Sequence, residues 1–408
     1  MMETHSPHPV ALHAAAASGT RVVGQTINDP LPESASLLLD VVRFTAAIMV
    51  VVGHYTGPDF NLGYGNSEFL GDIAVPVFFV LSGLVIRFVT LTRETTLRIY
   101  CIDRASRIYS VVLPAMAFTL IVTVLCFHLN PQAFHRDLAP TSNHPLLRLL
   151  ANLTFLSQAW GRNTIPFVNI PFWSLGYECI YYVLYGFMFY LRGWRRLLPC
   201  ALVAAIIGPQ VLFLLPVWWL GSWLYDFYLK SRRTAFARLV LWTAAFWIVL
   251  SGAFALAGLR SIALAPILLI ERFGHLRNPL LALGVQPMRA TLFAVAIGVT
   301  CAVTLYVALL AVDGLRISRD SWLAGRVRYI ANGTFTIYLM HYPFMLLLSY
   351  LGLLHRGHIV RNPLLMVAMC ALLIAAAAPI DTLKNAIRRW LRGWSARAHT
   401  TSAQSRPG

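Results

Sequence analysis

Charged residues are scarce in this chain. They make up 12% of its 408 residues, whereas 58% are hydrophobic. A soluble protein carries about twice that charged fraction, so the composition excludes a soluble enzyme. Apolar stretches long enough to cross a bilayer recur along nearly the whole chain, and no hydrophilic stretch after residue 36 is long enough to fold as a second domain. The sequence therefore predicts an all-α, polytopic membrane protein.

Acidic residues are also few, 16 against 33 lysines and arginines, and the formal net charge is +17. This charge would suit nucleic acid, but the basic residues lie in short clusters between apolar segments, which is typical of the positive-inside rule, so no nucleic-acid partner is expected. The six cysteines form no CxxC pair and lie mostly in apolar segments, which favours a packing role. His128, His135 and His144 have irregular spacing, so no metal site is predicted.

Three regions are expected along the chain. Residues 1–36 are rich in Ala, His, Pro and Ser and lack apolar periodicity, which predicts a disordered N-terminal tail. No basic segment precedes an uninterrupted apolar core there, so a cleavable signal peptide is not expected. Residues 37–383 are predicted to form the membrane domain, and residues 384–408 a basic C-terminal tail.

About ten membrane crossings are predicted. They lie near residues 37–56, 71–91, 108–128, 171–191, 196–214, 216–229, 236–258, 290–312, 327–352 and 363–383. Two further apolar stretches, 145–160 and 261–270, are too short for spans and are expected to be interfacial or re-entrant.

The basic residues predict the orientation. With the N-terminus inside, 23 lysines and arginines fall on the inner side and nine on the outer side, and Arg43 is the remaining one of the 33. The positive-inside rule then places both termini in the cytoplasm and the protein in the inner (cytoplasmic) membrane. Within the first crossing, Arg43 lies toward the inner side and His54 further outward.

Arg43 and His54 are eleven positions apart in this first apolar segment. In an α-helix their side chains point within roughly 20° of each other and are about 16 Å apart along the axis. An arginine at the bilayer centre costs at least ~2.5 kcal/mol, which favours a functional role. In the alternative interpretation, Arg43 lies near the membrane edge with its charge in water and His54 caps the other end.

Further polar motifs lie in or beside the apolar segments. The segment after the second crossing, which contains Asp103, Arg104 and Arg107, is expected to be a loop. Together with Arg43 and His54, the motifs are, in chain order, Phe78-Phe79-x-x-Ser82-Gly83, Arg104-x-x-Arg107, Trp173-Ser174-Leu175-x-x-Glu178 and Tyr338-Leu339-x-His341-x-Pro343.

In this order the motifs resemble the acyltransferase 3 family of integral membrane acyltransferases, over residues 37–383. The resemblance implies transfer of an acyl group, most often acetyl, from cytoplasmic acyl-CoA to a hydroxyl of a surface polysaccharide or lipid-linked glycan. It implies acyl-CoA as a co-substrate, no permanently bound cofactor, and membrane lipids as surroundings. The chain departs from the family pattern at Cys179, Pro76 and Met340, and these departures weaken any transfer of acceptor specificity.

The resemblance also implies roles for individual residues. His54 is expected to be the general base, because a neutral imidazole suits that role near pH 7, although a structural histidine bonded to a carbonyl is the alternative. Arg43 is expected to bind the CoA part of the donor. Arg104 and Arg107 either bind the nucleotide phosphates or only follow the positive-inside rule. Glu178 is expected to orient His54 or to pair with Arg43, either catalytically or as a structural salt bridge.

Three residues are expected to shape an acceptor pocket or to be structural, namely Ser82, Trp173 and His341. For Ser82 and Gly83, close helix packing is favoured over a nucleophile with oxyanion support.

Two rival functions are compatible with buried polar residues. A transporter of a lipid-linked sugar or small solute would use intramembrane Arg, His and Glu equally well. Transporters, however, often contain internal repeats, and the two halves of this chain do not resemble each other. A non-catalytic envelope assembly protein would leave these residues without a role.

Overall fold

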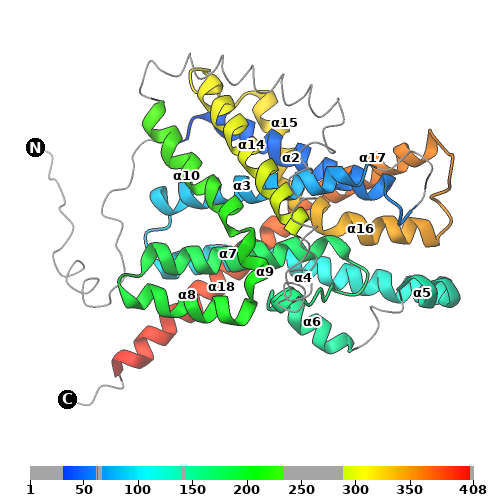
Figure 1. Cartoon of the computed structure of the whole chain (residues 1–408), viewed down its shortest axis with the longest axis horizontal. Helices are drawn as coiled ribbons and strands as arrows, with labels where there is room; N and C mark the ends of the chain where they lie inside the picture. The colour runs from blue at the N-terminus through cyan, green and yellow to red at the C-terminus, as the bar shows by residue number, and fades with distance from the viewer. Residues whose placement is uncertain (1–30, 61, 63–66, 139–143, 233–287, 405–408) are drawn as a thin grey trace, which may run out of the picture.

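The computed structural model describes residues 31–60, 62, 67–138, 144–232 and 288–404. The regular elements in this part of the chain are helices (Figure 1). The longer ones are α2 (Glu33–Thr56), α3 (Phe69–Thr92), α4 (Leu97–Leu129), α7 (Trp173–Tyr190), α10 (Leu215–Ser231), α14 (Met288–Val312), α16 (Thr334–Tyr350), α17 (Arg361–Ala375) and α18 (Ala377–Gln404). The shorter ones are α5 (Pro131–Leu138), α6 (Pro145–Leu153), α8 (Trp194–Ile207), α9 (Pro209–Phe213) and α15 (Trp322–Asn332).

The prediction of an all-α membrane protein is confirmed. Among the described residues, five helices are long and apolar enough to cross a bilayer, or up to six if one bent pair counts as a single span. Helices α7 and α16 are not among them. The predicted number of about ten crossings is therefore not confirmed, and the predicted crossing at 236–258 and the apolar stretch at 261–270 lie outside the described residues.

Several boundaries differ from the prediction. Helix α2 begins at Glu33, so residues 33–36 belong to the first helix and not to the predicted tail. Helix α4 begins at Leu97, where the Thr96 hydroxyl accepts a hydrogen bond from the Ile99 amide at 3.3 Å and caps the helix. The segment from Asp103 to Arg107 therefore lies within a helix, and its prediction as a loop was wrong.

Three predicted crossings are interrupted. The segment from Trp194 to Ser231 bends by 116° between α8 and α9, where Gly208 has a φ of +81° and Pro209 follows. The predicted crossing at 327–352 is divided into α15 and α16 at Gly333. The predicted crossing at 363–383 is divided at residue 376 between α17 and α18, which together still form one candidate span, Arg361–Trp394, and α18 continues as a helix to Gln404 through most of the predicted C-terminal tail.

Two apolar cores hold the helices together. One contains mainly residues of α3, α7, α10 and α14, and the other contains mainly residues of α2, α4, α16 and α17. In the first core, α3 and α10 pack backbone against backbone. A Cβ on Gly83 would lie 1.9 Å from the Trp218 carbonyl oxygen, and a Cβ on Gly221 would lie 1.9 Å from the Val80 carbonyl oxygen. Gly83 therefore permits close helix packing, as the sequence predicted.

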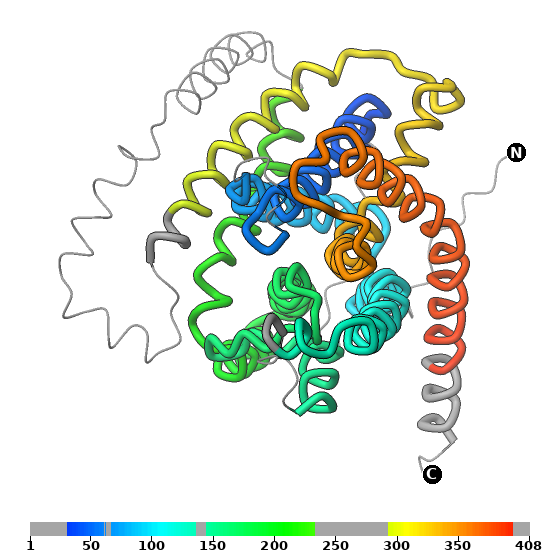
Figure 2. The backbone as a smooth tube through the Cα atoms, turned by 90° about the vertical axis from the view of Figure 1, so that its right-hand side faces the viewer, coloured from blue at the N-terminus to red at the C-terminus, as the bar shows by residue number. Residues whose placement is uncertain are grey.

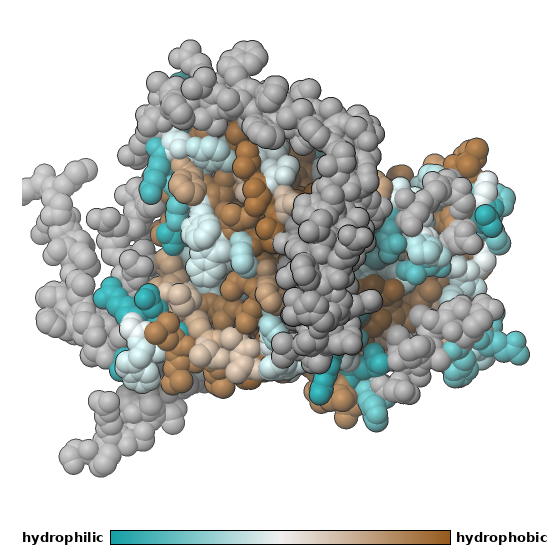
Figure 3. Space-filling view, in the orientation of Figure 1, coloured by the Kyte–Doolittle hydropathy of each residue, from teal (hydrophilic) through white to brown (hydrophobic). Residues whose placement is uncertain are grey.

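The arrangement of the helices suits a bilayer. Helices α2, α3, α4, α7, α16 and α17 run in similar directions, with α5 and α6 at one end of the bundle (Figure 1). The view along that direction shows α18 on one side of the bundle, with its C-terminal part projecting beyond the other helices (Figure 2). In the coloured part of the face shown in Figure 3, apolar side chains gather toward the middle and hydrophilic ones toward the left and right ends.

The six cysteines are unpaired, and Cys126 and Cys179 are buried. The burial of Cys126 and Cys179 agrees with the predicted role as small packing residues, whereas Cys101 is exposed.

Candidate active site

A pocket lies where α2, α3, α4, α7 and α16 converge. It encloses about 880 Å³ of empty space, part of which is open to solvent. Its polar lining contains Arg43, Ser82, Arg104, Arg107, Ser174, Glu178, Tyr182, Thr334 and Tyr338. Five of the eight predicted site residues therefore line one cavity although they come from four helices. Trp173, His54 and His341 do not line it.

Arg43 reaches this pocket from α2, which is an uninterrupted helix through both Arg43 and His54. A guanidinium nitrogen, Nη1, lies 3.6 Å from Oδ1 of Asp40, one turn earlier on the same helix. About 23% of the Arg43 side chain is exposed. The carboxylate lowers the cost of placing a cation here, and the guanidinium keeps a free edge toward the pocket.

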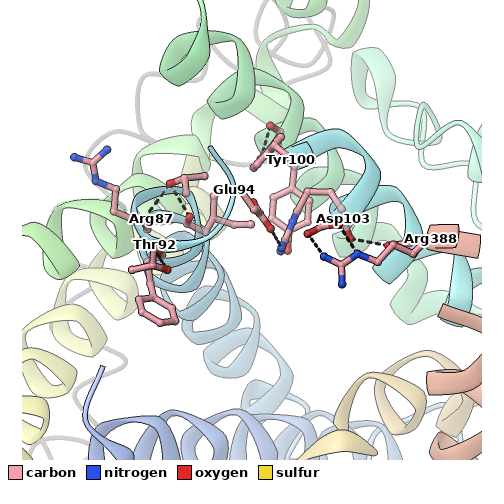
Figure 4. Close-up of polar contacts among 12 residues, drawn as sticks. Arg87, Thr92, Glu94, Tyr100, Asp103 and Arg388 are labelled. Atoms are coloured by element: carbon pink, nitrogen blue, oxygen red, sulfur yellow. Dashed lines mark hydrogen bonds and ion pairs between the residues drawn. The ribbon is translucent and has the colours of Figure 1, made fainter. Parts of the chain in front are cut away.

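The two arginines of α4 differ in their partners. Arg104 forms a buried ion pair with Glu94, which lies in the turn between α3 and α4, and it stacks near the Tyr100 ring at 6.0 Å (Figure 4). Arg107 forms no ion pair with the described residues, and its side chain is exposed in the pocket. Their predicted binding of nucleotide phosphates stays a prediction, but the structure distinguishes the two, because Glu94 pairs only with Arg104.

The Glu94 carboxyl group of this ion pair is itself buried. Its side chain is only 3% exposed, and this desolvation raises the pKa of the carboxyl above its ordinary value, although Arg104 acts in the opposite direction. The Tyr190 hydroxyl donates to the Glu94 backbone carbonyl and fixes the turn. Glu94 Oε2 and Arg104 Nε are both buried without a described hydrogen-bond partner, so the pair is tightly enclosed but incompletely satisfied.

Glu178 belongs to a hydroxyl network on the pocket wall. Its Oε1 accepts hydrogen bonds from Ser82 Oγ, at 2.6 Å, and from the Tyr182 hydroxyl. The indole nitrogen of Trp218 donates to Ser82 Oγ at 3.1 Å. The expected contact of Glu178 with His54 or Arg43 is not found, because these hydroxyls already hold the carboxylate on α7.

His54 lies near the end of α2 in an aromatic setting. Its ring is 5.5 Å from the His341 ring and meets the edge of the Tyr342 ring at 5.2 Å. The Tyr342 hydroxyl donates to Asp59 Oδ2 at 3.0 Å. Neither ring nitrogen of His54 has a hydrogen-bond partner among the described residues.

His341 is fully buried on α16, beside His54. Its Nδ1 lies 3.0 Å from two carbonyl oxygens, those of Ile337 and Tyr338. Carbonyls only accept hydrogen bonds, so this nitrogen carries the proton and Nε2 presents a lone pair. Nε2 is buried without a partner in the described part of the chain, which leaves one acceptor atom available next to His54.

Tyr338 connects the pocket to the two histidines. Its hydroxyl bonds to Ser174 Oγ at 2.5 Å on the pocket wall, and its ring lies 6.4 Å from the His341 ring. Trp173 packs edge-on against Tyr177 at 5.3 Å, which indicates a structural position outside the pocket lining.

Sequence reasoning missed several of these residues. Tyr182 could have been found, because it lies one helical turn after Glu178. No local signal links Glu94 to Arg104 or Trp218 to Ser82, because these contacts depend on how the helices pack. Asp103 on α4 was also missed as a partner of Arg388 on α18, to which it accepts two hydrogen bonds (Figure 4).

Comparison with known proteins identifies the family of this chain. A search of curated proteins and a search of solved structures each gave no match. The family model of acyltransferase 3, described as an acyltransferase domain, matches residues 37–381, which include all the pocket-lining residues and both histidines. The chain therefore belongs to the acyltransferase 3 family and is a membrane acyltransferase that transfers groups other than amino-acyl groups.

Proposed function

We propose that this protein transfers an acyl group, preferably acetyl, from cytoplasmic acyl-CoA to a hydroxyl of a surface polysaccharide or lipid-linked glycan. The supporting observation is a continuous series of groups. The pocket lined by Arg43 and Arg107 extends to Tyr338, whose ring is 6.4 Å from His341, and His341 is 5.5 Å from His54. Cations at one end and unpartnered imidazole nitrogens near the other suit an anionic donor and a hydroxyl acceptor.

In this proposal His54 is the catalytic base. The acceptor oxygen attacks the thioester carbonyl carbon while His54 takes the hydroxyl proton. The carbon–sulfur bond then breaks, and the CoA thiolate leaves and receives the proton from His54, which regenerates the neutral imidazole. The products are the acylated acceptor and free CoA, and no external reductant or oxidant is needed.

Arg43 and Arg107 bind the anionic and polar groups of the donor by charge-assisted hydrogen bonds. Glu178, held by Ser82 and Tyr182, is proposed to balance the charge of these guanidiniums across the pocket without contacting them, because its carboxylate lines the same pocket. The lone pair of His341 Nε2 is proposed to accept a hydrogen bond from the acceptor.

The proposed setting is the inner membrane, with about ten crossings and both termini in the cytoplasm. It rests on the excess of basic residues, 23 against nine, on the inner side. This orientation places Arg43, Glu94 and Arg107 toward the cytoplasm, where acyl-CoA is available, and His54 further outward.

The test uses membranes that contain the protein and acetyl-CoA labelled in its acetyl group. His54→Ala should lower the rate of acetyl transfer to the glycan fraction by roughly 10²–10⁴-fold, as expected for loss of a general base. His128→Ala is a matched control, because His128 is an exposed histidine at the end of α4 and outside the pocket. Its rate and both expression levels should equal those of the wild type.

A transporter would give a different result. It would move a solute without transferring label from acetyl-CoA, and loss of His54 would then alter uptake alone. A near wild-type transfer rate in the His54→Ala protein would refute the proposed role of the histidine.

A further inference from the structure

A second concave surface lies on α18, outside the pocket described above. Thr382, Asn385, Arg388, Arg389 and Arg392 line it. These positions recur at helical spacing and occupy one side of the helix. The lining offers three guanidiniums together with an amide and a hydroxyl, a set that suits a ligand with several phosphate oxygens. We refer to this surface as the α18 groove.

The Asp103 carboxylate holds two arginines of the α18 groove in place. Asp103 on α4 accepts hydrogen bonds from Arg388 at 2.7 and 2.5 Å, and it lies 3.6 Å from Arg392. Arg389 is exposed and has no carboxylate partner among the described residues. Two of the three arginines therefore share one aspartate and the third has no carboxylate partner among the described residues, so the groove keeps an excess of positive charge.

The α18 groove adjoins the pocket of the proposed acyl transfer. Asp103 directly precedes Arg104 on α4, and Arg107 follows four residues later, about 6 Å along the helix axis. Figure 4 shows Asp103 and Arg388 near Glu94, the partner of Arg104. A long anionic ligand can thus touch the groove at one end and enter the pocket past Arg107 at the other.

Anionic phospholipid is the competing occupant. The exposed Trp390 and Trp394, at 66% and 64% exposure, suit the membrane interface. However, these two tryptophans point roughly 150° away from the centre of the groove around the helix axis. A lipid surface that covers the tryptophans therefore leaves the arginines of the groove facing the other way.

We propose that the α18 groove binds the phosphate-bearing nucleotide of the acyl-CoA donor. This inference rests on the proposed function. Arg388, which binds Asp103 on α4, faces the diphosphate. Arg389, which has no carboxylate partner, faces the 3′-phosphate, the group with the highest charge. The pantetheine arm then runs past Arg107 into the pocket, and it carries the thioester toward His54.

The experiment combines a side-chain change with a donor change, in the full-length protein reconstituted in nanodiscs. Acetyl-CoA and 3′-dephospho-acetyl-CoA are the two donors, and KM and kcat are measured for each. Arg389→Gln should raise the KM for acetyl-CoA by about 10–100-fold with little change in kcat, as expected when a hydrogen bond to a charged group is lost. With 3′-dephospho-acetyl-CoA, the variant and the wild type should have equal KM values.

Lys384→Gln is the matched control. Lys384 is on the same helix, pairs with Asp381 at 2.5 Å and is not part of the groove lining. The Lys384→Gln substitution removes the same charge and should leave both KM values unchanged. Equal effects of the two variants, or an Arg389→Gln effect that persists fully with the truncated donor, would overturn the assignment to the 3′-phosphate.

The remaining outcomes show whether the α18 groove binds the acyl-CoA donor or an anionic phospholipid. An Arg389→Gln effect that appears only in nanodiscs with anionic lipid would assign the groove to phospholipid and refute the inference. If the wild type transfers no acetyl group from acetyl-CoA, the proposed function itself fails. If the wild type does transfer acetyl but does not distinguish the two donors, only the inference about the groove fails.

Discussion

The Glu94 carboxylate binds Arg104 and leaves Arg107, one helical turn further along α4, as the guanidinium available to a ligand. The two residues belong to one short motif, yet their surroundings give them different tasks. Arg104 joins the turn before α4 to the helix itself. Arg107 presents its charge to the pocket.

Substitution of these two arginines should therefore have separable effects. Arg107→Ala should raise the KM for the acyl donor by about 10–100-fold with little loss of thermal stability, because it removes contacts to charged groups of the donor. Arg104→Ala should lower the Tm, since it leaves the buried Glu94 carboxylate unpaired, at a cost of roughly 3–5 kcal/mol. Donor kinetics and a thermal shift assay on both variants check this. Equal KM effects in the two variants, without a difference in Tm, would contradict it.

The stability of the protein should depend on the pH through Glu94. Burial raises the pKa of this carboxyl above its ordinary value of 4.5, so the folded protein holds the proton more tightly than the unfolded chain. Stability from this group is therefore fully present below pH 4.5 and decreases as the pH rises through the folded-state pKa.

Glu94→Gln, which cannot titrate, should lack this component. The measurement is the Tm of detergent-solubilised wild type and variant between pH 4.5 and about pH 7. The difference in Tm, wild type minus variant, should decline across this interval. A difference that grows with pH would show that the ion pair with Arg104 outweighs burial.

The crossing of α3 and α10 should not tolerate any side chain at Gly83. The Cβ in Gly83→Ala would lie 1.9 Å from the Trp218 carbonyl oxygen, so the helices must separate, at a cost of at least ~1–3 kcal/mol. Gly325→Ala in α15 is the control, because nothing lies within 4 Å of the new Cβ, and it should be neutral or stabilising by ~0.5–1 kcal/mol. Thermal unfolding of the two variants is the measurement, and equal Tm values would argue against the close crossing.

The predicted topology can be tested with a membrane-impermeant maleimide on intact cells. Cysteine at position 356, in the turn between α16 and α17, should be labelled from outside. Cysteine at position 314, between α14 and α15, should be labelled only after the membrane is opened, as should the native exposed Cys101. Labelling of position 314 in intact cells would refute cytoplasmic placement of that turn.

The sequence predicted the parts of the fold that depend on local composition. The apolar run that includes Arg43 and His54 forms the continuous helix α2, as expected, because its length and hydrophobicity determine that outcome. The helical state of Asp103 to Arg107 was missed, since charged residues after a crossing resemble a loop. The cap by Thr96, which starts α4 earlier, was visible in the sequence but was not used.

The sequence predicted which residues line the candidate site better than it predicted which residues they bond to. Arg43, Ser82, Arg104, Arg107 and Glu178 do line one pocket. Their partners were not predicted, because a hydrogen bond such as that from Ser82 to Glu178 joins residues that are 96 positions apart and depends on the packing of α3 against α7. Side-chain chemistry indicates that a buried carboxylate needs a donor, but only the fold selects which donor it receives.

The glycine contacts between α3 and α10 also restrict how the molecule can open. Main chain lies against main chain at Gly83 and Gly221, so a lengthwise shift of either helix would bring larger side chains against the backbone of the other. The crossing of α3 and α10 is therefore a rigid contact on one side of the pocket. Helix α18 is attached differently, through the ion pairs of Asp103 with Arg388 and Arg392. Movement among the described helices is therefore easier at these side-chain contacts, which lie outside the pocket lining, than at the crossing of α3 and α10.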